Sequence, residues 1–160
     1  MGADAQARTE TVNSVTNQGW DGGVIGGLVG AIVMGAMIWL QNPAVLDGAI
    51  PAMYTLEGPA VGWVAHLLHG AIFGLVFVAF LQMPLLNRLG DTVVTAGVVG
   101  LLYGGALWVV AAGILMPVWL QTIGFAGAPA VPDWTLPGSL VPHLVYGVLL
   151  GVVYPFFAGR

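Results

Sequence analysis

Four apolar segments run through the sequence, and each is long enough to cross a membrane as a helix. The hydrocarbon core of a bilayer is about 30 Å thick, so a spanning helix needs roughly 20 residues. Only 6% of the residues are charged and 58% are hydrophobic, whereas soluble domains carry about 25% charged residues. We therefore predict an all-α, polytopic membrane protein, a four-helix transmembrane bundle solvated by the lipid bilayer. The predicted spans are residues 22–41, 60–83, 92–117 and 138–157.

The segment before the first span, residues 1–19, is polar. It contains Asp4, Arg8 and Glu10 and has no apolar core, whereas a secretory signal peptide has an apolar stretch of about 7–15 residues. We expect residues 1–19 to be a polar tail and residues 20–160 to be the transmembrane domain. The expected location is the plasma membrane, which the chain crosses several times.

The positive charges are few, and all of them fall on one side of the predicted bundle. Arg8 precedes the first span, Arg88 lies between the second and third, and Arg160 follows the fourth; there is no lysine. Positively charged residues are enriched in cytoplasmic loops. Both termini and the connection around Arg88 are therefore predicted to be cytoplasmic.

Charge and cysteine content exclude two further kinds of interaction. Three arginines and a net charge of -4 give no basic surface for a phosphate backbone, so no nucleic-acid partner is expected. The sequence contains no cysteine, which excludes disulfides and thiolate metal ligands.

The second half of the chain repeats features of the first. The sequence Tyr-Thr-Leu-Glu-Gly begins at Tyr54, and Trp-Thr-Leu-Pro-Gly begins at Trp134. Shortly after each, His66 and His143 begin the pattern His-Leu-x-x-Gly-x-x-x-Gly. Self-similarity at a fixed offset indicates a duplicated structural unit. We predict two parallel helical-hairpin repeats related by a pseudo-twofold axis along the membrane normal, covering about residues 22–83 and 92–157.

Glycines recur at the spacing of helix-packing motifs. Lipid tails are as apolar as leucine, so membrane helices associate where small residues allow close contact. The first span contains two series of glycines spaced four residues apart. Gly23 and Gly27 form one series, and Gly22, Gly26 and Gly30 form the other. We expect a tight bundle with glycine faces left over for another protein. The glycines expected to pack helices in both repeats are Gly23, Gly27, Gly70, Gly74, Gly100, Gly104, Gly147 and Gly151.

Three histidines fall inside the predicted spans. Ionisable residues within a membrane are costly to bury and often mark functional sites. His66 and His143 should lie at a similar depth, roughly 8–10 Å inside the ends of their helices. One interpretation is structural, with the imidazoles hydrogen-bonded across helices to each other, to Tyr146, or to a carbonyl near Pro142.

Two cofactor interpretations remain open beside the structural one. In the first, His66 and His143 are the axial ligands of a b-type haem held between the second and fourth spans. In the second, His66, His69 and His143 bind a transition metal such as zinc or copper.

Two motifs carry a resemblance to known proteins. The motifs are Gly62-Trp63-Val64-Ala65-His66 and His143-Leu144-Val145-Tyr146-Gly147. They resemble a group of small four-span membrane proteins of unknown function from halophilic archaea and some bacteria. In that group Trp-x-x-His opens the second span and His-Leu-x-Tyr-Gly opens the fourth. The resemblance covers about residues 22–157, implies a four-helix membrane protein, and directs attention to His66 and His143. Some relatives lie among respiratory components.

The sequence shows no catalytic signature. No carboxylate lies within a predicted span, and there is neither a Gly-x-Ser-x-Gly elbow nor a Walker-type phosphate loop. We therefore expect a protein that is not an enzyme and holds no cofactor. The leading hypothesis is an accessory subunit of a larger, respiratory membrane complex, whose partners are the bilayer and other membrane-protein subunits. The alternative is a haem- or metal-binding membrane protein that uses His66 and His143.

Overall fold

The computed structural model describes residues 19–134 and 138–158, and within these ranges all regular structure is helical. Four helical runs are long and apolar enough to cross a membrane, so the predicted multi-pass helical bundle is confirmed. The tail of residues 1–18, Arg8, Arg160 and residues 135–137 of the second repeated motif lie outside the described residues. The four runs are α2 (Trp20–Gln41), α4 (Pro59–Leu81), α5 (Val93–Leu107) continued by η3 (Trp108–Leu115) and α6 (Met116–Thr122), and α7 (Leu140–Phe157).

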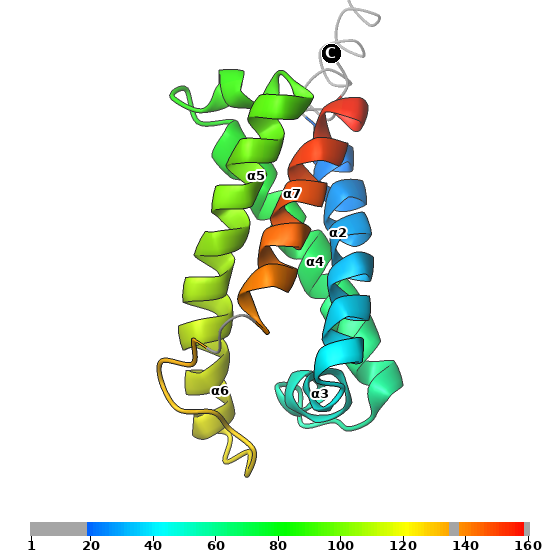
Figure 1. The fold of residues 1–160 in the computed structure, drawn as a ribbon, viewed down its shortest axis with the longest axis vertical. Coiled ribbons are helices and arrows are strands. Elements are labelled where there is room, and N and C mark those ends of the chain that lie inside the picture. Colours follow the sequence, from blue (N-terminus) through cyan, green and yellow to red (C-terminus); the bar gives the residue numbers. More distant parts are fainter. Residues whose placement is uncertain (1–18, 135–137, 159–160) are drawn as a thin grey trace, which may run out of the picture.

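Contacts join the helices in the order α4, α2, α7, α5. In the view of Figure 1, α4 lies behind α7 and α2. Helix α2 lies against both α4 and α7, whereas α5 lies closely against α7. The start of α2, the end of α7 and the connection between α4 and α5 lie at one end of the bundle (Figure 1). We call this the Arg88 end. The two longer connections, which follow α2 and α6, lie at the opposite end, which we call the loop end.

Glycines bring α2 into backbone contact with α4. A Cβ atom at Gly23 would lie 2.7 Å from the carbonyl oxygen of Gly74, and one at Gly27 would collide with the carbonyl of Gly70. Carbonyl oxygens of a helix backbone cannot move aside for a side chain, so only glycine fits here. The α5–α7 pair is built in the same way: Gly100 lies against the carbonyl of Gly147 and Gly104 against that of His143.

The second glycine series of α2 serves the contact with α7. Atoms added as Cβ at these glycines would lie 2.6, 2.9 and 2.8 Å from carbonyl oxygens of α7. The contacts are Gly22 with Tyr154, Gly26 with Leu150, and Gly30 with Tyr146. All glycines of the predicted series therefore pack inside the bundle. The expectation that a glycine face is left over for another protein is wrong for the described helices.

The two hairpins differ in register by one helical turn. Gly27 meets the carbonyl of Gly70 on α4, but Gly104, 77 residues later, meets the carbonyl of His143, which corresponds to His66. Four residues make one turn of about 6 Å. Helix α7 is thus displaced along α5 relative to the position of α4 along α2.

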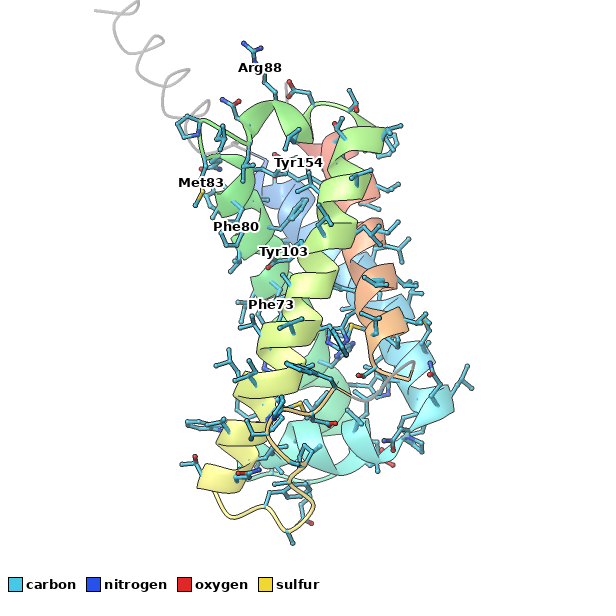
Figure 2. All side chains as sticks on the ribbon, turned by 60° about the vertical axis from the view of Figure 1, so that its left-hand side comes forward. Phe73, Phe80, Met83, Arg88, Tyr103 and Tyr154 are labelled. Carbon is cyan, nitrogen blue, oxygen red and sulfur yellow. The ribbon has the colours of Figure 1, made fainter. Side chains whose placement is uncertain are left out.

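Helices α4 and α5 meet through side chains instead of backbones. The positions 77 residues after Gly22, Gly26 and Gly30 are Val99, Tyr103 and Leu107, which are too large for a glycine-type contact. The Tyr103 hydroxyl donates to the carbonyl oxygen of Phe73 at 2.8 Å. Its ring centroid lies 5.3 Å from that of Phe77 and 6.1 Å from that of Phe80. We call this interface the α4–α5 seam; Figure 2 shows Tyr103 between Phe73 and Phe80.

A proline explains why the third span is π-helical in its middle and longer than predicted. Pro117 has no N–H to donate to the carbonyl four residues earlier, Gly113, and its ring crowds that carbonyl. The wider η3 turn absorbs the clash, so the helix continues to Thr122 instead of ending near residue 117. The freed carbonyl of Gly113 accepts a hydrogen bond from the backbone N–H of Asp133 at 2.9 Å. The second long connection is therefore attached to the span.

The first long connection also combines a π-helical turn with a proline. Its π-helical turn η1 (Val45–Ala49) leads into the short helix α3 (Ile50–Ala52), whose second residue is Pro51. The carbonyl of Asp47, which Pro51 cannot satisfy, accepts the backbone N–H of Gly58 at 3.1 Å. This closed loop packs on the bundle: Gly62 of α4 lies directly against the carbonyl of Leu46.

Candidate functional site

His66 joins α4 to α2. Its side chain is 6% exposed, and Nε2–H donates to the carbonyl oxygen of Ala31 at 2.9 Å. A carbonyl only accepts, so this contact requires the hydrogen on Nε2. Trp63 packs edge-on against the imidazole, with centroids 6.2 Å apart. Gly35 makes room for both rings, because a Cβ there would lie 3.0 Å from Cδ2 of His66 and closer still to Trp63.

His69 joins α4 to the first long connection. Its Nε2 shares a hydrogen bond with the hydroxyl of Tyr54, and the two rings stack with centroids 5.8 Å apart. On the other side, the ring of Phe73 lies at 6.4 Å. Thr55 holds the turn that presents Tyr54: it has φ of 58°, unusual for a β-branched residue, and its Oγ1 donates to the Tyr54 carbonyl at 2.6 Å.

His143 is bonded within its own helix. Its Nδ1–H donates to the carbonyl oxygen of Ser139, one turn earlier, at 2.7 Å. The hydroxyl oxygen of Ser139 accepts the indole N–H of Trp108 at 2.8 Å. The ring of Trp108 in turn lies 6.4 Å from that of Trp134. Ser139 thereby connects the start of α7 to the start of the π-helical segment.

Two tyrosines fix α4 from neighbouring helices. Tyr146 of α7 is fully buried, and its hydroxyl donates to the carbonyl oxygen of Gly70 at 2.7 Å. Tyr103 of α5 does the same to Phe73, three residues further along α4. The partner of Tyr146 is thus a backbone carbonyl and not a histidine.

The histidines named by the sequence are thus placed in three separate contacts. His66 bonds to α2, His69 to the first connection, and His143 to α7 itself. Within residues 19–134 and 138–158, no three His, Cys, Asp or Glu side chains lie close enough together to hold a metal ion. The three-histidine arrangement of the metal interpretation is not brought together.

The contacts also do not fit a haem between α4 and α7. His66 gives its Nε2 hydrogen to Ala31 and His143 gives its Nδ1 hydrogen to Ser139, so the two rings would offer different nitrogens to an iron. Haem-binding helices must also leave space for the macrocycle. Between α4 and α7 that space is filled by the buried Tyr146 ring, whose hydroxyl reaches the Gly70 carbonyl.

Two of the partners were not expected from the sequence: Ala31 and Tyr54. A backbone carbonyl such as that of Ala31 leaves no trace in the residue type, so no signal could identify it. For Tyr54 the sequence offers one indication of a role, because Tyr54 is the first residue of the repeated motif. The Ser139 carbonyl lies three residues before Pro142, near which the sequence predicts a carbonyl partner, although the bond stays within one helix instead of crossing between helices.

Chemically, the site is a set of hydrogen bonds that hold helices and connections together. Each of the histidine and tyrosine groups described above has a partner within the protein. Polar side chains commonly join membrane helices in this way, at about 0.6 kcal/mol per bond on average. Comparisons of the chain with protein-family models, with curated proteins and with solved structures find no match.

Proposed function

We propose that the protein is a non-catalytic integral membrane subunit of a larger membrane assembly, and that it meets its partner through the third span. The observation that supports this most directly is the burial of the spans. Within the bundle, 17% of the most apolar window of Val93–Thr122 is buried, against 39%, 39% and 33% for the other three spans. The third span is thus the least buried of the four, although α5 packs closely against α7.

The exposed surface of α5 has the form of a helix-packing stripe. Residues four apart lie on the same face of a helix, and the exposed side chains of α5 follow this spacing. Val94, Val98 and Leu102 are among the most exposed apolar residues of the span. The stripe continues through Ala106, which is also exposed, to Val110 at the start of η3. A partner helix laid along this stripe would give the third span the burial that the others already have.

The polar groups support a structural role. A general base or a cofactor ligand needs a nitrogen or oxygen that faces a substrate or an iron. The side chains of His66, Tyr103 and Tyr146 instead face backbone carbonyls of neighbouring helices. The respiratory nature of the assembly is part of the proposal and rests on the resemblance of the two histidine motifs.

We also propose an orientation in the plasma membrane. The start of α2, the end of α7 and the connection between α4 and α5 lie at the same end of the bundle (Figure 1), and Arg88 belongs to that connection. The rule that positive residues stay inside then puts the Arg88 end, and both termini, in the cytoplasm. The loop end, with its packed connections, would face outward.

The two hairpins are proposed to be parallel repeats of about residues 22–83 and 92–157. In support, both hairpins close through glycines at matching positions, Gly23 and Gly27 in one and Gly100 and Gly104 in the other. The one-turn difference in register means that the pseudo-twofold axis along the membrane normal relates the hairpins only approximately.

The experiment is site-specific photo-cross-linking in native membranes. A photoreactive residue is placed at Val98 on the stripe or at Ile32 on the far side of α2, two positions that are each 54% exposed. The proposal predicts one dominant protein adduct from position 98 and none from position 32. Equal labelling at the two positions, or a lone monomer in native mass spectrometry of gently extracted protein, would rule out the proposed interface.

A further inference from the structure

The connection between α4 and α5 exposes apolar side chains around one arginine. Leu85 is 90% exposed, and Met83 and Leu89 are also exposed. Arg88 lies in the last turn of the short 3₁₀ helix η2 (Asn87–Gly90). Apolar side chains at a helix end combined with a positive charge are typical of segments that lie in the interface between headgroups and acyl chains.

Arg88 is the single cationic side chain of the described residues, because Arg8 and Arg160 lie outside them and the chain has no lysine. Figure 2 shows its side chain extending away from the end of the bundle, beyond Met83 and Phe80. The guanidinium group offers a planar set of N–H donors that matches the oxygens of a phosphate. Among the residues that the structure describes, Arg88 is therefore the position suited to an anionic headgroup.

The α4–α5 seam begins toward the same end of the bundle as this arginine, as Figure 2 shows. Phe80 is exposed at the end of α4, and the seam is lined further on by Phe73, Phe77 and Tyr103. Tyr103 lies ten residues beyond Val93, the first residue of α5, which is about 15 Å along the helix. That length is about half of the 30 Å hydrocarbon core, which is one leaflet. At Tyr103 the hydrogen bond to Phe73 closes the seam.

We propose that the Arg88 end binds an anionic glycerophospholipid. Arg88 donates to the phosphate and headgroup, and one acyl chain lies over Met83 and Phe80 along the seam as far as Tyr103. This inference is independent of the partner surface on α5, because Val94, Val98 and Leu102 lie on another face of that helix.

Asp91 offers a second test of the proposal, with the opposite expected effect on lipid preference. It lies three residues after Arg88 in the same connection, and its backbone N–H donates to the Arg88 carbonyl at 3.3 Å. A carboxylate in the same short connection repels an anionic headgroup, so it should lower the preference that Arg88 creates. Removing each charge should therefore change the lipid preference in opposite directions.

The test uses the full chain reconstituted in vesicles of equimolar phosphatidylglycerol and phosphatidylcholine with identical acyl chains. The protein is extracted gently, and native mass spectrometry gives the ratio of the two retained lipids. Arg88→Gln should lower the phosphatidylglycerol to phosphatidylcholine ratio about fivefold, Arg88→Lys should keep it, and Asp91→Asn should raise it. An unchanged ratio in Arg88→Gln would overturn the proposal. If that variant does not fold, an unchanged ratio in Asp91→Asn overturns it equally.

A second pair of variants tests the acyl-chain site. Phe80→Ala should lower the amount of both lipids retained, because it removes apolar surface from the seam. Leu40→Ala, at an exposed position near the loop end of α2, is the matched control and should retain as much lipid as the unmodified protein. Equal retention by the two variants would show that no acyl chain lies on Phe80.

Discussion

The hydroxyl of Tyr103 donates a hydrogen bond to the carbonyl oxygen of Phe73 at 2.8 Å, and through this bond α5 reaches α4. The corresponding position of α2, 77 residues earlier, is Gly26, which lies directly against the carbonyl of Leu150 on α7. The α2–α7 interface is therefore close because Gly26 has no side chain, whereas the α4–α5 interface is joined by the large side chain of Tyr103. This difference makes the bundle asymmetric and leaves α5 as its least covered helix.

Two substitutions of Tyr103 distinguish the contribution of its hydrogen bond to stability from that of its ring. Tyr103→Phe keeps the ring contacts with Phe77 and Phe80 and should cost about 0.6 kcal/mol of unfolding free energy, the average for a hydrogen bond between membrane helices. Tyr103→Ala also removes the ring and should cost about 3 kcal/mol. Unfolding in mixed micelles, followed by circular dichroism, measures both. Leu102→Ala, on the exposed face next to Tyr103, is the control. If Tyr103→Ala loses as little unfolding free energy as this control, the ring of Tyr103 does not pack the seam.

Glycine substitutions distinguish positions that touch a backbone from positions that do not. Gly27→Ala should destabilise the bundle by about 1–3 kcal/mol, because its Cβ would collide with the Gly70 carbonyl. Gly105→Ala meets only the end of the Leu144 side chain at 3.7 Å, and it should be neutral or stabilise by up to about 1 kcal/mol through helix propensity. Thermal unfolding in detergent compares the two variants. Equal melting temperatures would contradict the close contact between α2 and α4.

The main features of the fold could be predicted from the sequence because each depends on local composition. The start of α2 at Trp20, the start of α4 at Pro59 and the end of α7 at Phe157 all lie within two residues of the predicted limits, because apolar length alone determines a spanning segment. The length of the third span could not be predicted. Its continuation past Pro117 depends on the N–H of Asp133, donated from a distant connection.

The candidate site was predictable in its residues and not in its contacts. Ionisable residues within a membrane mark candidate sites whatever their partners are, so the sequence alone identifies His66, His69 and His143. That Gly104 packs against a helix backbone follows from small-residue spacing, but its partner, the His143 carbonyl, lies one turn from the position that corresponds to Gly70. That His66 bonds to the backbone of Ala31, and His69 to Tyr54, depends on the relative rotation of α2, α4 and the first connection. No residue pattern specifies that rotation.

Substitution of His66 tests its structural role directly. His66→Ala removes the donor to the Ala31 carbonyl and leaves a cavity between α2 and α4, and it should lower the unfolding free energy by about 1–3 kcal/mol. His66→Gln places an amide N–H at a similar reach and should recover part of that loss. The visible absorption spectrum and metal content of the purified variants are measured in parallel. Loss of a haem band or of a bound metal from His66→Ala, without a change in stability, would instead support the cofactor alternative.

Pro117 connects the π-helical segment to the second long connection, and its replacement should uncouple them. In Pro117→Ala the new backbone N–H can donate to the Gly113 carbonyl as in an ordinary α-helix. The N–H of Asp133, which donates to that carbonyl in the present structure, then loses its acceptor. Its amide hydrogen should exchange about tenfold faster, as expected for the loss of one hydrogen bond. The amide of Ala128, bonded within the same connection to the Phe125 carbonyl, should be unaffected. Unchanged exchange at Asp133 in hydrogen–deuterium exchange mass spectrometry would mean that the connection is held by other contacts, and that the proline does not cause the π-helical turn.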